Sequence, residues 1–484
     1  MSKQARRSCA QCRQLQARID ELERRLDVQN QENQSLRADL MRLQEKLAAA
    51  QKDSSTSSKP PSSDIVKPPP ASDAGGGERR AIGGQPGHPK HEREPFPPEQ
   101  VTHFEEYLLE ACPCCGGRLR RNGHFARIVQ QIDIERPMLT IAQHTSPEYW
   151  CDRCQRAFKA GMPSVIEKGG LVGPQLTALI AYLKGACHAS FSTIRTFLRD
   201  VVGVTIARGE LSKILGKVTA ALDKPYEELL QALPNEAWVN VDETGHKDKG
   251  QGWWTWCWRA ELYTLYRIDA HRNAEVLMDT LGREFAGILG CDYFSAYRRY
   301  LRECSVCVQF CLAHLIRDVK FLTTLPDASD RQYGERLRLA LKELFGVFHQ
   351  RAELPAKVFQ ARLQAARERV LQAGLSQVPP TRHSQNMAKR FREHGEAYFT
   401  FITMPGVEPT NNLAEQAIRF VVIDRHITQG TRSEGGRRWS ERIWTVIATC
   451  VQQGKSVYQF LCAAIGNWFA NQPAPTLLPS AMKG

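Results

Sequence analysis

The sequence predicts a multidomain α+β protein, in which several smaller segments precede an α/β core that carries a helical insertion. Three observations support this fold class: a heptad repeat near the N-terminus, two matched CxxC pairs, and a series of apolar strand-like runs after residue 234. A chain of 484 residues with 42% hydrophobic content is long enough for roughly three domains.

The composition favours an intracellular protein with a polyanionic partner. Lys and Arg outnumber Asp and Glu by 65 to 52, which gives a net charge of +13, and such a balance favours binding to nucleic acid. The basic N-terminus precedes no apolar segment, and the sequence has no run of about 18 apolar residues. We therefore expect a cytoplasmic protein with no membrane partner, in which paired cysteines indicate metal rather than disulfides.

Residues 1–52 are predicted to form a coiled coil. Apolar side chains recur at alternating spacings of four and three, and Asn33 lies where a buried polar residue favours a two-stranded parallel coil. A single amphipathic helix packed on its own domain is the alternative. The seam consists of Leu15, Ile19, Leu22, Leu26, Gln29, Asn33, Leu36, Leu40, Leu43 and Leu47. Residues 53–98, rich in Ser, Pro and Gly, are predicted to be a flexible linker.

Residues 99–165 are predicted to form a zinc ribbon. Two CxxC pairs supply four thiolates for one closed tetrahedral site, at Cys112, Cys115, Cys151 and Cys154. The runs ARIVQQIDI and LTIAQHT between the pairs are predicted strands. A second group, Cys304, Cys307, Cys311 and His314, has the residue types of a metal site, but a core strand that leads into a helix explains it better.

Residues 166–233 are predicted to be helical. Apolar residues recur at helical spacing on both sides of a break at VGVT, the layout of a helix-turn-helix, although such helix pairs also occur without DNA. If the pair binds DNA, the second helix would read it through Arg208, Lys213 and Lys217.

The run AWVNVDETGHK predicts a strand that ends at Asp242. Two further strand-like runs follow, and the alternating tryptophans of GWWTWCWRA indicate one buried face, with a base-stacking platform as the alternative. After a helix, FAGILGCDYFSAY predicts a strand that ends at Asp292. One more strand, a helix and a largely helical insertion precede NNLAEQAIRF, a helix that carries Glu415 and Arg419.

This order of elements is that of a ribonuclease-H-like fold, in which the first and fourth strands are neighbours. Asp242 and Asp292 would then meet at adjacent strand ends, and the late helix would bring Glu415 to them. Three carboxylates suit Mg²⁺ or Mn²⁺, and two such ions support phosphoryl transfer. Neighbouring basic residues are candidates to hold phosphates, namely His246, Lys247, His314, Arg317, Arg419 and Arg425.

Motifs along nearly the whole chain resemble those of the transposases of the insertion sequence 66 family. They are SSKPPSSD, GGQPGH, CPCCGG followed by CDRC, VDET, CLAHLIRD and NNLAEQAIR, in the family's order. The resemblance implies a DDE transposase with Asp242, Asp292 and Glu415 as the catalytic triad and Arg419 as the basic residue of the last motif. The segment FVVIDRHITQGTRS, which contains Arg425, departs from the family pattern.

The expected activity is metal-dependent cleavage at the element's terminal inverted repeats and transfer of the 3′-OH ends to target DNA. The expected partners are this DNA, a second copy of the chain or a higher oligomer, and accessory proteins of the element, with the protein on the bacterial nucleoid when bound. The rivals are a DNA-binding regulator without catalysis and a structure-selective nuclease of the same fold. The catalytic core is expected at 234–324 and 406–484, with C-terminal helices in its second part and the helical insertion at 325–405 between them.

Overall fold

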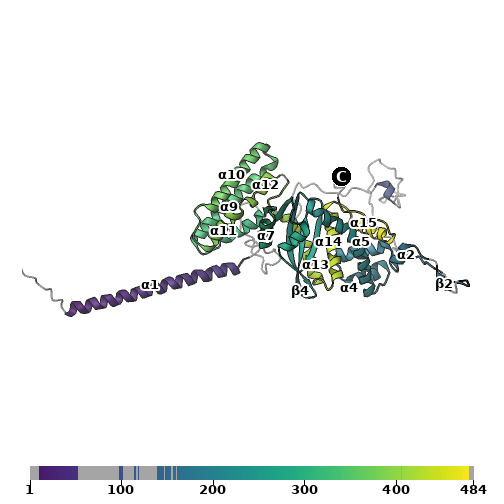
Figure 1. The fold of residues 1–484 in the computed structure, drawn as a ribbon, viewed down its shortest axis with the longest axis horizontal. Coiled ribbons are helices and arrows are strands. Elements are labelled where there is room, and N and C mark those ends of the chain that lie inside the picture. The colour runs from purple at the N-terminus through teal and green to yellow at the C-terminus, as the bar shows by residue number, and fades with distance from the viewer. Residues whose placement is uncertain are drawn as a thin grey trace, which may run out of the picture. The chain divides into compact units, whose positions relative to one another are not determined.

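The computed structural model describes residues 10–52, 97–101, 114–115, 118, 139–146, 148–153, 156–159, 161–404 and 406–478. Figure 1 draws these residues as a coloured ribbon. Helices and a five-stranded sheet make up an α+β chain, as the sequence predicts. No helix in these ranges is long and apolar enough to cross a membrane.

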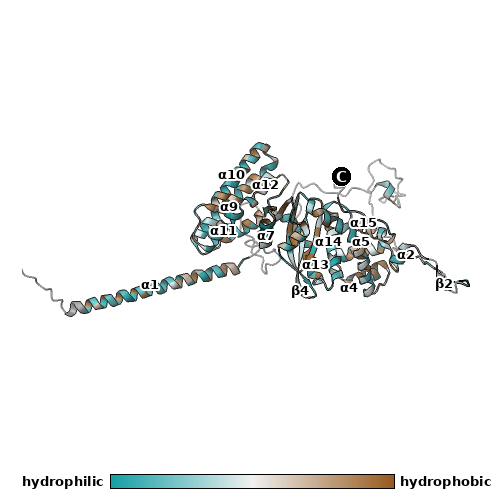
Figure 2. Ribbon diagram, viewed as in Figure 1, coloured by the Kyte–Doolittle hydropathy of each residue, from teal (hydrophilic) through white to brown (hydrophobic). Residues whose placement is uncertain are grey.

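Helix α1 (Ala10–Ala50) leaves an apolar stripe exposed to solvent. Figure 2 shows apolar residues interspersed along its length. The leucine and isoleucine side chains of the heptad seam are 47% to 65% exposed in the single chain. A stripe of this kind needs a partner to be buried, and the coiled coil stays a prediction.

The predicted zinc site lies only in part among the described residues. Cys112 and Cys154 are outside them, as is the first predicted strand, ARIVQQIDI. Cys115 lies in an exposed turn, and Cys151 ends a strand.

The prediction of a second strand in the zinc ribbon, at LTIAQHT, is wrong. Residues 139–145 adopt no regular structure, and the strands form later, as an antiparallel pair of β1 (Glu148–Cys151) and β2 (Arg156–Lys159). The alternating pattern of LTIAQHT is that of a strand, but a strand also needs a partner for its backbone hydrogen bonds. In the described part of this segment, that partner is present for 148–151, which pair with 156–159.

The region before the sheet is helical, as predicted, and breaks at the predicted place. Gly203 has φ of 86°, a left-handed conformation that ends the first helix of the predicted pair, which consists of α4 and η3. Helix α5 is 25 residues long and buries an apolar face against α14 and α15. Most of the second helix therefore serves the core, which leaves its N-terminal turns for any contact with DNA. The segments are α2 (Ser164–Gly169), α3 (Pro174–Gly185), α4 (Phe191–Phe197), η3 (Leu198–Val202) and α5 (Arg208–Ala232).

The central sheet has the strand order β5-β4-β3-β6-β7. Its first three strands are antiparallel neighbours, whereas β3 pairs with β6, and β6 with β7, in parallel. The predicted adjacency of the first and fourth strands is thus observed. The elements are β3 (Trp238–Asp248), β4 (Gln251–Arg259), β5 (Thr264–Asp269), α6 (Ala274–Leu281), β6 (Ile288–Cys291), α7 (Ser295–Cys304), β7 (Cys307–Phe310) and α8 (Leu312–Leu322).

Strand β3 does not end at Asp242, contrary to the sequence prediction. It continues to Asp248 because its backbone stays paired with β4 from Asn240 to Asp248. Only the parallel pairing with β6 ends before Asp242. A polar run that is half of a long hairpin stays extended, since cross-strand hydrogen bonds rather than side-chain polarity hold it.

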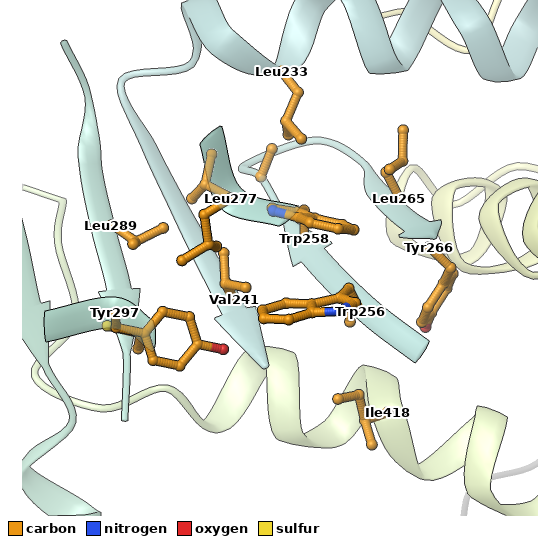
Figure 3. Packing of buried hydrophobic residues seen from close by; sticks show 14 of the residues in the cluster. Leu233, Val241, Trp256, Trp258, Leu265, Tyr266, Leu277, Leu289, Tyr297 and Ile418 are labelled. Carbon is orange, nitrogen blue, oxygen red and sulfur yellow. The ribbon is translucent and has the colours of Figure 1, made fainter. Parts of the chain in front are cut away.

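The alternating tryptophans of β4 are part of the core. Trp256 and Trp258 are fully buried, with ring centroids 6.0 Å apart, and Figure 3 shows them on one face of their strand beside Val241. Full burial excludes these two rings from base stacking. The interpretation as one buried face holds only in part, because Trp254 is half-buried and Thr255 and Cys257, on the opposite face, are buried too.

The remaining helices complete the chain. Helices α13 and α14 pack against the sheet, and α9 to α12 lie between α8 and α13, where the sequence predicts a helical insertion. The α-helices are α9 (Ala328–His349), α10 (Ala356–Leu375), α11 (Arg382–His394), α12 (Thr400–Thr403), α13 (Asn412–Thr428), α14 (Glu434–Gln452) and α15 (Val457–Phe469). Short 3₁₀ turns are η2 (Pro98–Gln100), η4 (Leu233–Asn235), η5 (Gln350–Ala352) and η6 (Glu396–Tyr398).

Replacing Gly287 should weaken the pairing of β3 with β6. A Cβ at this position would overlap the carbonyl oxygens of Glu236 and Ala237 and the ring of Phe285. We expect Gly287→Ala to lower the free energy of unfolding by about 1–3 kcal/mol, measured by urea denaturation. Gly252→Ala is the matched control, since nothing lies within 4 Å of its added Cβ. Equal effects of the two substitutions would contradict this account of the strand contact.

Candidate active site

The two aspartates lie at equivalent positions relative to neighbouring parallel strands, Asp242 within β3 and Asp292 directly after β6. The last paired residues of β3 and β6 are Asn240 and Gly290. Asp242 and Asp292 each follow two residues later. Because side chains two residues apart point to the same face of a strand, this register directs both carboxylates to one side of the same sheet edge.

A polar turn fixes Asp292 after β6. Its Oδ1 accepts a hydrogen bond from the backbone N–H of Phe294, at 2.8 Å, in the turn that leads into α7. Asp242 Oδ1 accepts from the backbone N–H of Glu243, at 2.9 Å. Within the described residues the second oxygen of each carboxylate has no hydrogen-bond partner, which leaves it for another ligand.

Asn411 ties the start of α13 to the centre of the sheet. Its Nδ2 donates to the carbonyl oxygen of Val241, at 2.8 Å, and its backbone N–H donates to Cys311 Sγ, at 3.2 Å. The Asn411 carbonyl in turn accepts from the N–H of Glu415, at 3.2 Å, in the first turn of α13. Glu415 is therefore fixed next to the residue that precedes Asp242.

Asp242 is buried among other carboxylates. Burial raises the pKa of Asp242 well above its usual range, and the negative charges of Glu243, Asp292 and Glu415 raise it further. A divalent cation among these oxygens would relieve that repulsion and favour the ionised form. Glu415 Oε1 also lacks a hydrogen-bond partner within the described part of the chain, which leaves it free to bind a cation.

Glu243 is a fourth carboxylate that the sequence analysis did not include in the site. Its side chain is 2% exposed and forms an ion pair with Arg272, at 2.7 Å, and a short hydrogen bond with Tyr297. Burial and the charge of Asp292 raise its pKa, whereas Tyr297 and Arg272 lower it. The VDET motif contains this residue, but nothing in the local sequence reveals its distant partners.

His314 and Arg317 are the predicted phosphate ligands that do reach the carboxylates. His314 Nδ1 lies 3.6 Å from Glu415 Oε1, and Arg317 Nη2 lies 3.6 Å from Glu415 Oε2. Burial lowers the pKa of His314, while the charges of Glu415 and Asp292 raise it. Cys311, which the sequence analysis assigned to the core, lies in the same cluster.

The other predicted DNA ligands lie on different elements. Arg208 and Lys213 are exposed on α5, and Lys213 pairs with Glu210 at 3.4 Å. Lys217 instead donates to the carbonyl oxygen of Gly169, at 2.9 Å, so its ammonium group already has an internal partner.

The two predicted arginines of α13 differ in their surroundings. Arg419 is exposed. Arg425 donates to the carbonyl oxygen of Gly245 and to Thr244 Oγ1, the latter at 3.1 Å, and thus attaches α13 to β3.

His246 has the surroundings of a buried structural residue rather than those of a phosphate ligand. It is 4% exposed, and its two ring nitrogens contact the hydroxyls of Thr255 and Thr431 at 3.3 and 3.0 Å. Burial lowers its pKa to about 4, so the imidazole is neutral near pH 7. Lys247, next to it, is exposed.

The raised pKa of Asp242 predicts how stability depends on pH. Between the unfolded pKa of about 3.9 and the higher folded value, the folded chain binds the extra proton, so stability falls as pH rises through this window. Asp242→Asn keeps the acceptor oxygen but cannot ionise. We expect it to raise the free energy of unfolding at pH 7 by about 1–2 kcal/mol, measured by urea denaturation in magnesium-free buffer.

The gain should disappear below about pH 4, where both forms are neutral. Asp279→Asn, at an exposed position on α6, is the matched control and should change stability little at either pH. A gain that is the same at both pH values would argue against burial of a charged Asp242.

Comparisons with known proteins agree with these features. The family model "Transposase IS66 family" matches residues 169–438. An uncharacterized protein of Sinorhizobium fredii, y4qI, is 23% identical over 376 residues, which cover 71% of this chain and 68% of the relative.

One solved structure also matches, a chain of the "CryoEM structure of simian T-cell lymphotropic virus intasome in complex with PP2A regulatory subunit B56 gamma". It is 14% identical and covers 42% of this chain and 70% of that chain, with a TM-score of 0.14. A TM-score this low does not establish a common fold. The family model spans more than half of the chain and contains both strands of the aspartates and the helix of Glu415, and the chain therefore belongs to the Transposase IS66 family.

Proposed function

We propose that this chain is a DDE transposase with a ribonuclease-H-like catalytic core, which cleaves DNA at terminal inverted repeats and joins the 3′-OH ends to target DNA. The observation that supports this proposal most directly concerns the two aspartates. Asp242 and Asp292 each lie two residues beyond the last paired residues of the parallel strands β3 and β6. Glu415 is attached to β3 through Asn411.

Asp242, Asp292 and Glu415 would hold Mg²⁺ or Mn²⁺. Carboxylate oxygens are the ligands these ions prefer. Burial raises the pKa of Asp242 and repulsion by neighbouring carboxylates adds to it, and a cation would remove that repulsion. When bound, the metal activates the attacking oxygen and stabilises the leaving oxygen of a phosphodiester.

The remaining residues of the site position these ligands. Asn411 fixes the start of α13, so Glu415 needs little reordering to reach the aspartates. Arg272 and Tyr297 hold Glu243 in place. With its charge paired in this way, Glu243 competes less with the triad for a cation. The exposed Arg208, Lys213 and Arg419 are available for phosphates, which position DNA without reading its sequence.

The N-terminal segments would supply assembly and end recognition. A coiled-coil dimer through α1 would hold two element ends in one complex, and a zinc ribbon at Cys112, Cys115, Cys151 and Cys154 would assist in binding DNA. Accessory proteins of the same element are further candidate partners.

Conservative substitution of the triad should abolish cutting but not binding. We expect Asp242→Asn, Asp292→Asn and Glu415→Gln each to reduce Mg²⁺-dependent cleavage of labelled element ends by at least about 100-fold, because each removes a charged ligand. Binding of the same DNA, followed by fluorescence anisotropy, should change by less than about twofold, since phosphate contacts dominate affinity.

The matched controls are Asp279→Asn and Glu393→Gln, at exposed positions on α6 and α11. Cleavage that survives any triad substitution would exclude that residue from the site. A wild-type protein that binds ends but neither cuts them nor joins pre-cleaved ends would support the regulator. One that cuts branched DNA without element ends would support the nuclease.

The seam of α1 should determine the oligomeric state. Leu22→Glu combined with Leu26→Glu places charges at two seam positions that are 50% and 62% exposed in the single chain. We expect this variant to have the mass of one chain in light scattering and to lose complexes that contain two DNA ends. Val28→Glu is the matched control, because Val28 is apolar and 56% exposed but lies outside the seam. Dimers that persist in the double variant would refute the coiled coil.

A further inference from the structure

Three potential metal ligands of different chemistry meet beside the carboxylates. Cys311 precedes α8, His314 lies one turn further on, and Glu415 comes from α13. Their ligand atoms all lie within 4.8 Å of one another. Residues three apart at the start of a helix share a face, so Cys311 and His314 approach Glu415 from the same side.

The cluster contains buried polar atoms with unused bonding capacity. Cys311 is 1% exposed and His314 is 7% exposed. Neither His314 Nδ1 nor Glu415 Oε1 has a hydrogen-bond partner within the residues that the structure covers. Leaving such buried atoms unsatisfied is unfavourable, because they have lost their hydrogen bonds to water. The two atoms face each other at 3.6 Å, a separation at which both can bind the same ion.

The geometry suits a tetrahedral ion. A metal about 2.1 Å from each of two atoms 3.6 Å apart would form an angle of roughly 120° between them, near the tetrahedral value. Cys311 Sγ already accepts the backbone N–H of Asn411, at 3.2 Å, a contact that also stabilises a thiolate. Sulfur, imidazole nitrogen and one carboxylate oxygen form a donor set for Zn²⁺ or Co²⁺ rather than for Mg²⁺.

We propose that Cys311, His314 and Glu415 form a binding site for Zn²⁺ with an open fourth position, and that zinc at this site draws Glu415 away from Asp242 and Asp292. The inhibition that follows rests on the proposed function, whereas the binding itself does not. The site would make the enzyme sensitive to the balance between Zn²⁺ and Mg²⁺.

Arg317 opposes this binding. Its Nη2 lies 3.6 Å from Glu415 Oε2 and its Nη1 lies 3.4 Å from His314 Nε2. A metal on Nδ1 leaves the proton of a neutral imidazole on Nε2, and two donors cannot share a hydrogen bond. Arg317 must therefore turn away when zinc binds, and its removal should tighten binding.

Cobalt titration of the full chain tests the site without reference to activity. Co²⁺ substitutes for Zn²⁺, and its bond to a thiolate absorbs in the near ultraviolet. Because the predicted zinc ribbon would bind Co²⁺ too, the variants are compared with the wild type. We expect Cys311→Ser to lose one equivalent of Co²⁺ and the matching part of the thiolate absorption. Cys307→Ser, which changes an exposed thiol on β7, should lose neither.

Two further variants keep Cys311 in place. His314→Gln should weaken binding of the same equivalent by at least about 10-fold, because it removes one of three protein ligands. Arg317→Met should strengthen it by about 10-fold, because a competing positive charge is removed. Unfolding midpoints near that of the wild type confirm that each variant folds. Equal stoichiometry and equal affinity in wild type, Cys311→Ser and His314→Gln would overturn the proposal.

The effect on activity is measured separately. Zn²⁺ added to Mg²⁺-driven cleavage should slow the wild type by a larger factor than Cys311→Ser. Equal inhibition of both would overturn the link to Glu415. If the wild type does not cleave DNA, the proposed function fails, and the cobalt titration still decides whether the metal site exists.

Discussion

The parallel pairing of β3 with β6 is the constraint on which the rest of the site depends. It places Asp242 and Asp292 at equal distances beyond the last paired residues, Asn240 and Gly290. Gly290 permits this approach, since a Cβ there would overlap the Asn240 side chain. The hydrogen bond from Asn411 to Val241 then adds α13 to the same strand. One strand contact and one side-chain hydrogen bond thus place residues that are far apart in the sequence.

This arrangement has an electrostatic cost. Burial, and with it the like charges at one sheet edge, raises the pKa of Asp242 and Glu243, and in the absence of a cation the folded chain must tolerate these costs or bind a proton. Arg272 and Tyr297 offset part of the cost at Glu243, but among the described residues no comparable partner compensates the charge of Asp242. Sites that favour function over stability commonly show such an imbalance.

The sequence predicted the order of elements along the chain and the adjacency of the first and fourth strands, because apolar runs and the helix between them constrain topology strongly. It misplaced the end of β3, since hydrogen bonds with β4 rather than polarity decide where that strand stops. It assigned Glu243 no role in the site, because the partners of this side chain, Arg272 and Tyr297, are distant in the sequence. The weak ligand pattern around Cys311 and His314 reads as an ordinary strand and helix, and their proximity to Glu415 depends on the loop at Asn411, which no local periodicity encodes.

Glu415 has two sets of neighbours, and this explains why its helix is attached so firmly. On one side its charge acts on Asp242; on the other its oxygens face His314 and Arg317, both at 3.6 Å. Asn411 contacts both sides, since it bonds to β3 through its side chain and to Cys311 through its backbone. In the proposed zinc site, the carboxylate would change partners by rotating its side chain while α13 stays in place. The type of cation, rather than a movement of the fold, would then decide whether Glu415 joins the hard oxygen ligands or the sulfur and nitrogen ligands.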